Sequence, residues 1–189
     1  MRPQILRRET VYAGYATLER VLVRMPDGEE VWREVQSHGH AVAVLPYDPA
    51  RRVAYTVRLY RIPVMICGGA EPLEEACAGM IDKADGDSAQ AARREALEEL
   101  GMRLGELEDV GLVWTSPGIV AETCHLFLAP VTAAARIAPG GGAPGEYEGI
   151  EVLERSLADL TKAADAGLIR DAKLLLLVQT LRLRRPDLF

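Results

Sequence analysis

Cysteine is scarce in this sequence of 189 residues. The three cysteines, Cys67, Cys77 and Cys124, are odd in number and share no C-x-x-C spacing. Both facts argue against a disulfide framework and against a zinc site. We therefore expect buried or half-buried thiols in a reducing cytoplasm.

Long apolar runs are absent as well. The most apolar run, at residues 174–178, is far shorter than the roughly 18 residues of a membrane span. Residues 1–8 contain no apolar segment of signal-peptide length. We expect a soluble, cytoplasmic protein with no membrane partner, and residues 174–178 packed on a sheet.

Positive charge is the minority sign, with 22 Lys and Arg against 28 Asp and Glu and a net charge of -6. This balance argues against a nucleic-acid partner. A protein of this charge that handles an anionic substrate needs a metal ion and local arginines to overcome its own field. The length and the 49% apolar content suffice for a globular domain with its own core.

Local patterns predict an α+β fold with a mixed β-sheet between helices. Turn residues and alternating apolar residues separate the expected strands. Helices are expected at residues 88–100, from a Ser156 cap through residue 166, and from an Asp171 cap through residue 184. Strands are expected at residues 10–24, 30–37, 41–47, 53–60, 71–78, 109–115, 122–131 and 150–153.

The helix at residues 88–100 places three carboxylates on one face, since Glu95, Glu98 and Glu99 are spaced i, i+3 and i+4. Like charges one turn apart cost about 0.2–0.5 kcal/mol unless they are neutralised. Arg94 can reach Glu98, but Ala91 offers Glu95 no partner at the preceding turn. The spacing alone leaves two interpretations open, a solvated charged face and a cation site.

The residues around this helix resemble the Nudix box, G-x5-E-x7-R-E-U-x-E-E-x-G-U with U apolar. Every residue from Arg94 to Met102 fits the pattern. The front half departs, because fourteen residues separate Gly79 from Arg94 where the pattern has thirteen. Asp85 or Asp87 stands in for the first glutamate of the pattern.

The resemblance covers nearly the whole chain and is to the ADP-ribose pyrophosphatase group, nearest its GDP-mannose hydrolase branch. It rests on residues 75–82, 115–118, 146–154 and 167–173 as well as the box. It implies the Nudix fold and hydrolysis of a nucleoside diphosphate sugar to a nucleoside monophosphate and a sugar 1-phosphate. Two alternatives stay open: ADP-ribose hydrolysis to AMP and ribose 5-phosphate, and a nucleotide-sugar sensor without turnover.

The resemblance also implies a metal site of oxygen donors. Its ligands are expected to be Glu95, Glu99, the carbonyl of Ala78 and Glu148, with Glu98 as a further ligand or water contact. Carboxylate oxygens suit Mg2+, and Mn2+ is possible.

For catalysis, the resemblance assigns the general base to Glu146, at the far end of the glycine-rich loop 139–145. That loop cannot pack a core and is expected to be mobile. Glu148 is an alternate for the base, and Glu98 is the rival from the box. Arg94 is expected to orient a box carboxylate through a charge-assisted hydrogen bond.

Substrate contacts follow from the same likeness. Of the two arginines Arg58 and Arg61, at most one should face the site, and the likeness selects Arg61 as a phosphate or sugar contact. Tyr15, Arg33 and His38 are expected in the nucleotide pocket, although a plain surface or core role for His38 stays open.

Two segments are expected. Residues 1–38 form an N-terminal hairpin that turns at Pro26-Asp27-Gly28, and residues 39–189 form the Nudix hydrolase domain. Because an isolated two-stranded hairpin is marginal in water, we expect a homodimer, with the hairpins exchanged.

Overall fold

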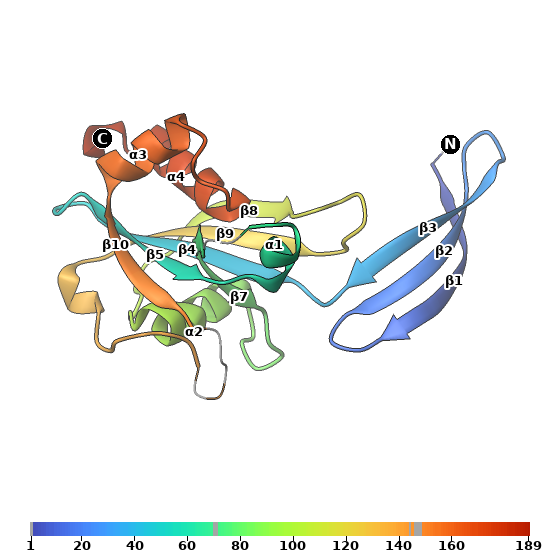
Figure 1. Ribbon diagram of the computed structural model, residues 1–189, viewed down its shortest axis with the longest axis horizontal. Coiled ribbons are helices and arrows are strands. Elements are labelled where there is room, and N and C mark those ends of the chain that lie inside the picture. Colours follow the sequence, from blue (N-terminus) through green and yellow to red (C-terminus); the bar gives the residue numbers. More distant parts are fainter. Residues whose placement is uncertain (1, 70–71, 144, 146–148) are drawn as a thin grey trace. The chain divides into compact units, whose positions relative to one another are not determined.

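The computed structural model describes residues 2–69, 72–143, 145 and 149–189, and the chain forms two compact units. The first unit comprises Met1–His40 and Val113–Cys124. The second comprises Ala41–Leu112 and His125–Phe189. Figure 1 shows the elements of both.

The first unit contains an antiparallel sheet in the order β1-β2-β3, from β1 (Gln4–Ala13), β2 (Thr17–Arg24) and β3 (Glu30–Ser37). The predicted turn between β2 and β3 is present, and the Gly28 amide donates to the Met25 carbonyl at 2.9 Å. The prediction of one strand over residues 10–24 is wrong, because the chain reverses at residues 14–16 and β1 pairs with β2. Apolar alternation continues on both sides of this turn, so the pattern alone did not reveal it.

The second unit is built on a seven-stranded sheet with the order β10-β5-β4-β9-β8, while β6 pairs with β5 and β7 with β4. The single strand predicted over residues 71–78 is two short strands, β6 and β7. The bounds are β4 Ala41–Asp48, β5 Val53–Leu59, β6 Leu73–Glu75, β7 Cys77–Met80, β8 Glu108–Trp114, β9 Thr123–Pro130 and β10 Glu151–Ser156.

Helices lie on both faces of this sheet, as predicted (Figure 1). Helix α2 (Ser88–Leu100) covers one face, and α3 (Leu157–Asp165) and α4 (Ala172–Arg184) cover the other. The predicted caps are confirmed, since Ser156 accepts from the Asp159 amide and Asp171 from the Leu174 amide, both at 3.0 Å. A short helix, α1 (Ile62–Ile66), was not predicted, and two 3-10 turns lie at Ala133–Ala135 and Pro186–Leu188.

The core of this unit follows from the alternation of strand side chains. Val42 and Val44 of β4 lie in a buried cluster with Ala92, Ala96 and Leu100 of α2. This cluster determines which face of α2 packs on the sheet. The glutamates of the helix therefore lie at the edge of the buried cluster.

The apolar run at residues 174–178 lies within α4, where Leu174, Leu177 and Val178 are buried. This agrees with the expectation that the run packs on the sheet, since α4 contacts β4. None of the helices within the described ranges has the length and hydrophobicity that a membrane crossing requires.

Candidate active site

The predicted carboxylate helix is α2, with the same bounds, Ser88–Leu100. Asp87 caps it by accepting from the Gln90 amide at 2.8 Å. Gly101 ends it in the left-handed conformation, with φ of 67°, which favours glycine. Three glutamates of the helix, Glu95, Glu98 and Glu99, therefore occupy fixed positions on a helix that is capped at both ends.

Strand β7 approaches α2 closely at Gly79. A Cβ atom added at Gly79 would overlap the Glu95 carboxylate, so any other residue here would displace that carboxylate. One residue earlier, the Ala78 amide donates to Glu99 Oε2 at 3.1 Å. The structure thus brings together Ala78, Glu95 and Glu99, three of the residues expected to hold a metal ion.

Arg94 connects these carboxylates to the loop before the helix. Its Nη1 donates to Glu95 Oε1 and to Glu98 Oε2, both at 2.9 Å. Its Nε and Nη2 donate to the two carboxylate oxygens of Asp85 at 2.8 and 3.0 Å, and Nη2 also donates to the Met80 carbonyl at 2.9 Å. Glu95 therefore does have a cationic partner, its own sequence neighbour, which an argument from i±4 spacing could not find.

The two aspartates left open by the sequence have different roles in the structure. Asp85 is buried, with 7% of its surface exposed, and hydrogen bonds from Arg94 hold its pKa below the usual range. The Asp82 amide also donates to Asp85, at 2.7 Å. Asp87 is the helix cap. It is therefore Asp85 that lies beside the box arginine.

A buried thiol lies next to the carboxylates. Burial, reinforced by the nearby negative charge of Glu99, raises the pKa of Cys77 well above its usual range, so the thiol is neutral. Cys77 and Cys124 are buried as expected. Cys67 is exposed, contrary to expectation, because it follows α1, a helix with no buried residue.

The glutamates of α2 are the candidate ligands for a divalent ion. Among the described residues, no group of three or more His, Cys, Asp or Glu side chains is arranged to hold a metal ion. Glu95 and Glu98 accept hydrogen bonds from Arg94, and Glu99 accepts one from the Ala78 amide. The donors are nonetheless all oxygen, and the space that Gly79 leaves admits a carboxylate beside the strand backbone. This donor set fits a hard cation such as Mg2+ or Mn2+.

Glu146 and Glu148, the expected base and its neighbour, lie outside the described residues. The glycine-rich loop before them was expected to be a mobile arm. The structure instead attaches its first part to the end of α2, since the Gly141 amide donates to the Glu99 carbonyl at 2.8 Å and the Gly142 amide to the Glu98 carbonyl at 3.1 Å. These glycines allow a close approach of two backbones, because a Cβ atom at Gly140 would overlap the Glu99 carbonyl.

Arg61 lies in a charge cluster that the sequence did not indicate. Its guanidinium donates to Glu75 at 2.7 and 3.2 Å, and Lys173 Nζ donates to Glu75 at 3.2 Å and to Asp171 at 2.7 Å. Burial alone would raise the pKa of Glu75, but its contacts with Arg61 and Lys173 outweigh burial and lower it. Glu75 and Lys173 have no motif spacing in sequence, so only the fold brings them together.

Arg58 has a different surrounding from Arg61. It donates to Glu151 of β10 at 3.0 and 2.6 Å and lies at the strand surface. Among the described residues, Arg61 thus contacts Glu75 and Arg58 contacts Glu151.

The remaining expected substrate residues belong to the first unit. The rings of Tyr15 and His38 are 6.0 Å apart, and His38 Nε2 lies 2.8 Å from the Glu122 carboxylate. His38 Nδ1 is buried and has no hydrogen-bond partner among the residues that the structure describes. Arg33 Nη1 donates to the Trp32 carbonyl at 3.1 Å. Tyr15 is 86% exposed, so its ring is available to a ligand.

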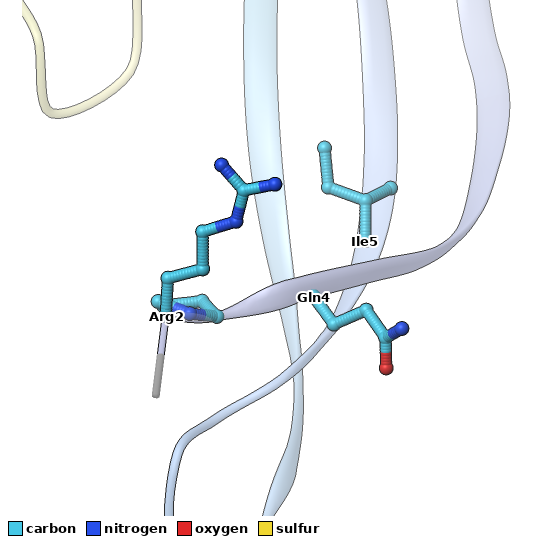
Figure 2. A pocket seen from close by; sticks show the side chains of 4 residues that line it. Arg2, Gln4 and Ile5 are labelled. Carbon is cyan, nitrogen blue, oxygen red and sulfur yellow. The ribbon is translucent and has the colours of Figure 1, made fainter.

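A hollow lies at the start of β1, lined by Arg2, Pro3, Gln4 and Ile5 (Figure 2). Arg2 and Ile5 point to one side of the strand and Gln4 to the other. These lining residues include neither a carboxylate nor a nucleophile, so the hollow contributes nothing to the chemistry expected at α2.

Comparisons with known proteins identify relatives of this chain. The NUDIX domain model matches residues 37–178. The GDP-mannose pyrophosphatase of Cronobacter sakazakii is 41% identical over 186 residues, which cover 96% of this chain and 95% of that protein. That of Salmonella arizonae is 34% identical over 152 residues, 80% of this chain and 78% of that protein.

A solved structure supports the fold. The crystal structure of an ADP compounds hydrolase matches with a TM-score of 0.79, covering 99% of this chain and 96% of that one. The two sequences are 19% identical, so this likeness concerns the fold alone.

Proposed function

This chain belongs to the Nudix family and is a hydrolase of pyrophosphate bonds, and we propose that its substrate is a nucleoside diphosphate sugar of the GDP-mannose type. The observation that carries the proposal is the 41% identity to a GDP-mannose pyrophosphatase over nearly the full length of both chains. The products would be a nucleoside monophosphate and a sugar 1-phosphate.

Hydrolysis breaks the P–O–P bridge and adds the oxygen of one water to phosphorus. The two phosphates repel a nucleophile, so the site must neutralise their charge and remove a proton from the attacking water. A bound divalent ion supplies charge neutralisation and a more acidic water. All other steps fall to side chains of the chain itself.

We propose that Glu95, Glu99 and the carbonyl of Ala78 hold Mg2+, with Glu148 as a further ligand. In support, Ala78 and Gly79 of β7 lie directly against Glu95 and Glu99 of α2. Mn2+, with similar ligand preferences, would serve as a substitute.

We propose that Glu146 accepts the proton of the attacking water and that Glu98 stays beside the metal ligands. Hydrogen bonds between the glycine-rich loop and α2 support this assignment, because the Gly141 and Gly142 amides donate to the carbonyls of Glu99 and Glu98. The loop that leads to Glu146 is thereby attached to the helix that carries the other glutamates. Arg94 orients Glu95 and Glu98 through its Nη1, which donates to both.

For substrate binding we propose Arg61 as a phosphate or sugar contact, and Tyr15, Arg33 and His38 as nucleotide contacts. Glu75 fixes Arg61 with two hydrogen bonds, which lowers the entropy lost when it binds an anion. Tyr15 offers an exposed aromatic ring on which a base can stack.

We also propose a homodimer joined through the N-terminal sheet, with the N-terminal hairpins exchanged. The chain is proposed to be organised into an N-terminal segment, residues 1–38, and the Nudix hydrolase domain, residues 39–189. Support comes from exposed apolar side chains on the first unit. Ile5, Val11 and Tyr12 are 65%, 56% and 59% exposed on β1. A partner that covers them would remove this apolar surface from water.

A substrate panel tests the proposed function. GDP-mannose, ADP-ribose and ADP-glucose are incubated with the protein and Mg2+ or Mn2+, and products are separated by ion-exchange chromatography. We expect the highest kcat/KM on GDP-mannose, with GMP and mannose 1-phosphate as products. A higher kcat/KM on ADP-ribose would replace the proposed substrate, and no turnover with any metal would favour the sensor.

A further inference from the structure

Asp171 makes more contacts than a helix cap requires. As the cap of α4 it accepts from the Leu174 amide through Oδ2 at 3.0 Å and from the Lys173 amide through Oδ1 at 3.4 Å. The same Oδ2 accepts from the Ala76 amide at 3.2 Å, and Oδ1 from Lys173 Nζ at 2.7 Å. Only 7% of Asp171 is exposed. The bond to Ala76, across 95 residues of sequence, is not part of capping.

Ala76 connects β6 to β7 and lies two residues before Ala78. The Ala78 amide is itself held by a carboxylate, Glu99 of α2, at 3.1 Å. Two helices on opposite faces of the sheet therefore each supply a carboxylate to the same short segment, at alternate amides (Figure 1). With two such bonds on residues 76–78, the segment has little freedom to shift relative to α2.

We propose that Asp171 is a positioning residue for the metal site. Through the Ala76 amide it fixes the segment that carries the Ala78 carbonyl and Gly79 against Glu95 and Glu99. Through Lys173 it also holds Glu75, the partner of Arg61. This inference rests on the proposed function, because the metal site at Ala78, Glu95 and Glu99 is itself part of that proposal.

The variant Asp171→Ser separates positioning from capping. Serine caps helices about as well as aspartate, so α4 keeps its cap. Its single, shorter-reaching oxygen does not replace both carboxylate oxygens, so the bonds to Ala76 and Lys173 are lost. The matched control is Ser156→Ala, which removes the cap of the neighbouring α3, where Ser156 accepts from the Asp159 amide.

Electron paramagnetic resonance measures the binding of Mn2+ directly, in the absence of substrate. Hydrogen exchange of residues 73–80 is measured in parallel. Substitution of a group that holds a metal ligand in place typically weakens metal affinity by about 10- to 100-fold. We expect the Mn2+ dissociation constant to rise about 10-fold in Asp171→Ser, with faster exchange at residues 73–80, and neither change in Ser156→Ala.

Each outcome has one meaning. If Asp171→Ser binds Mn2+ as tightly as the wild type, or if Ser156→Ala weakens binding equally, Asp171 is only a cap and the positioning role is overturned. If the wild type binds no Mn2+ and hydrolyses no nucleotide sugar, the proposed function fails and the positioning role fails with it. If Mn2+ binding is weakened in Asp171→Ser and not in Ser156→Ala, the result supports both the proposed metal site and the positioning role of Asp171.

Discussion

Arg94 and Asp85 are joined by two parallel hydrogen bonds, Nε to Oδ1 at 2.8 Å and Nη2 to Oδ2 at 3.0 Å. The remaining nitrogen of the guanidinium, Nη1, donates to Glu95 and Glu98. Because a guanidinium is planar, fixing one edge on Asp85 fixes the direction in which the other edge meets the two glutamates. Asp85, which lies before α2 in the chain, thereby orients the Arg94 side chain toward Glu95 and Glu98.

Asp85→Asn should destabilise the protein. The substitution removes a charge from a bidentate pair in which Asp85 is buried and Arg94 is partly buried. Hydrogen bonds to charged groups contribute about 1.5–3 kcal/mol. We expect the free energy of unfolding, measured by urea denaturation, to be lower than that of the wild type by about 1.5–3 kcal/mol. Asp87→Asn is the control, since asparagine caps a helix as well as aspartate does. Equal losses in the two variants would contradict the distinct roles of the two acids.

Gly79→Ala should impair metal binding and turnover while the chain still folds. The added Cβ atom would overlap the Glu95 carboxylate and displace it. Misplacement of a reacting group by about 1 Å can cost roughly 100-fold in rate. We expect a loss of kcat of that order and weaker Mn2+ binding by calorimetry.

The control for Gly79→Ala is Gly105→Ala. An added Cβ atom at Gly105 meets nothing within 4 Å, and its backbone is not in the left-handed region. This variant should keep wild-type kinetics. If Gly79→Ala also does so, the close approach of β7 to α2 has no catalytic meaning.

Glu146→Gln and Glu98→Gln should decide which glutamate is the general base. Removing a general base typically costs about 100- to 10,000-fold in rate. We expect Glu146→Gln to lose kcat within that range and to retain Mn2+ affinity. Near-normal turnover of Glu146→Gln, together with a loss of that size in Glu98→Gln, would assign the base to Glu98.

Glu75 should make stability depend on pH in the acid range. Its folded-state pKa is lowered, so its contribution is complete above the unfolded-state pKa of about 4.3 and is lost as the pH falls through the lower folded value. Glu75→Gln should therefore be less stable than the wild type by about 2 kcal/mol at pH 7. Chemical denaturation across the acid range should show this difference shrinking as the pH falls. A constant difference would mean that packing, not charge, accounts for the contribution.

The N-terminal sheet should hold two copies of the chain together. Sedimentation velocity at micromolar concentration should give a dimer, because β1 exposes Ile5, Val11 and Tyr12. Val11→Glu, which adds a charge to that surface, should shift the equilibrium toward the monomer. A wild-type monomer under these conditions would rule out the proposed association.

The sequence predicted the regular elements well where chemistry at the ends was explicit. Ser156 starts α3 and Asp171 starts α4, as predicted, because each cap satisfies a neighbouring backbone group. The bounds of α2 were also predicted, and the structure adds that Asp87 and Gly101 cap its ends. The reversal at residues 14–16 was missed because apolar alternation runs through it. The helix α1 was missed because it buries none of its side chains, and so has no apolar face to detect.

By itself the sequence determined the spacing of Glu95, Glu98 and Glu99, the likeness to the Nudix box and the α+β class, since these depend on periods and short-range contacts along the chain. Only the tertiary structure decided that Asp85 rather than Asp87 meets Arg94, that Gly79 makes room for Glu95, and that Asp171 holds Ala76. These contacts join residues distant in sequence or on different elements. Their energies depend on side-chain direction and burial, which spacing along the chain does not specify.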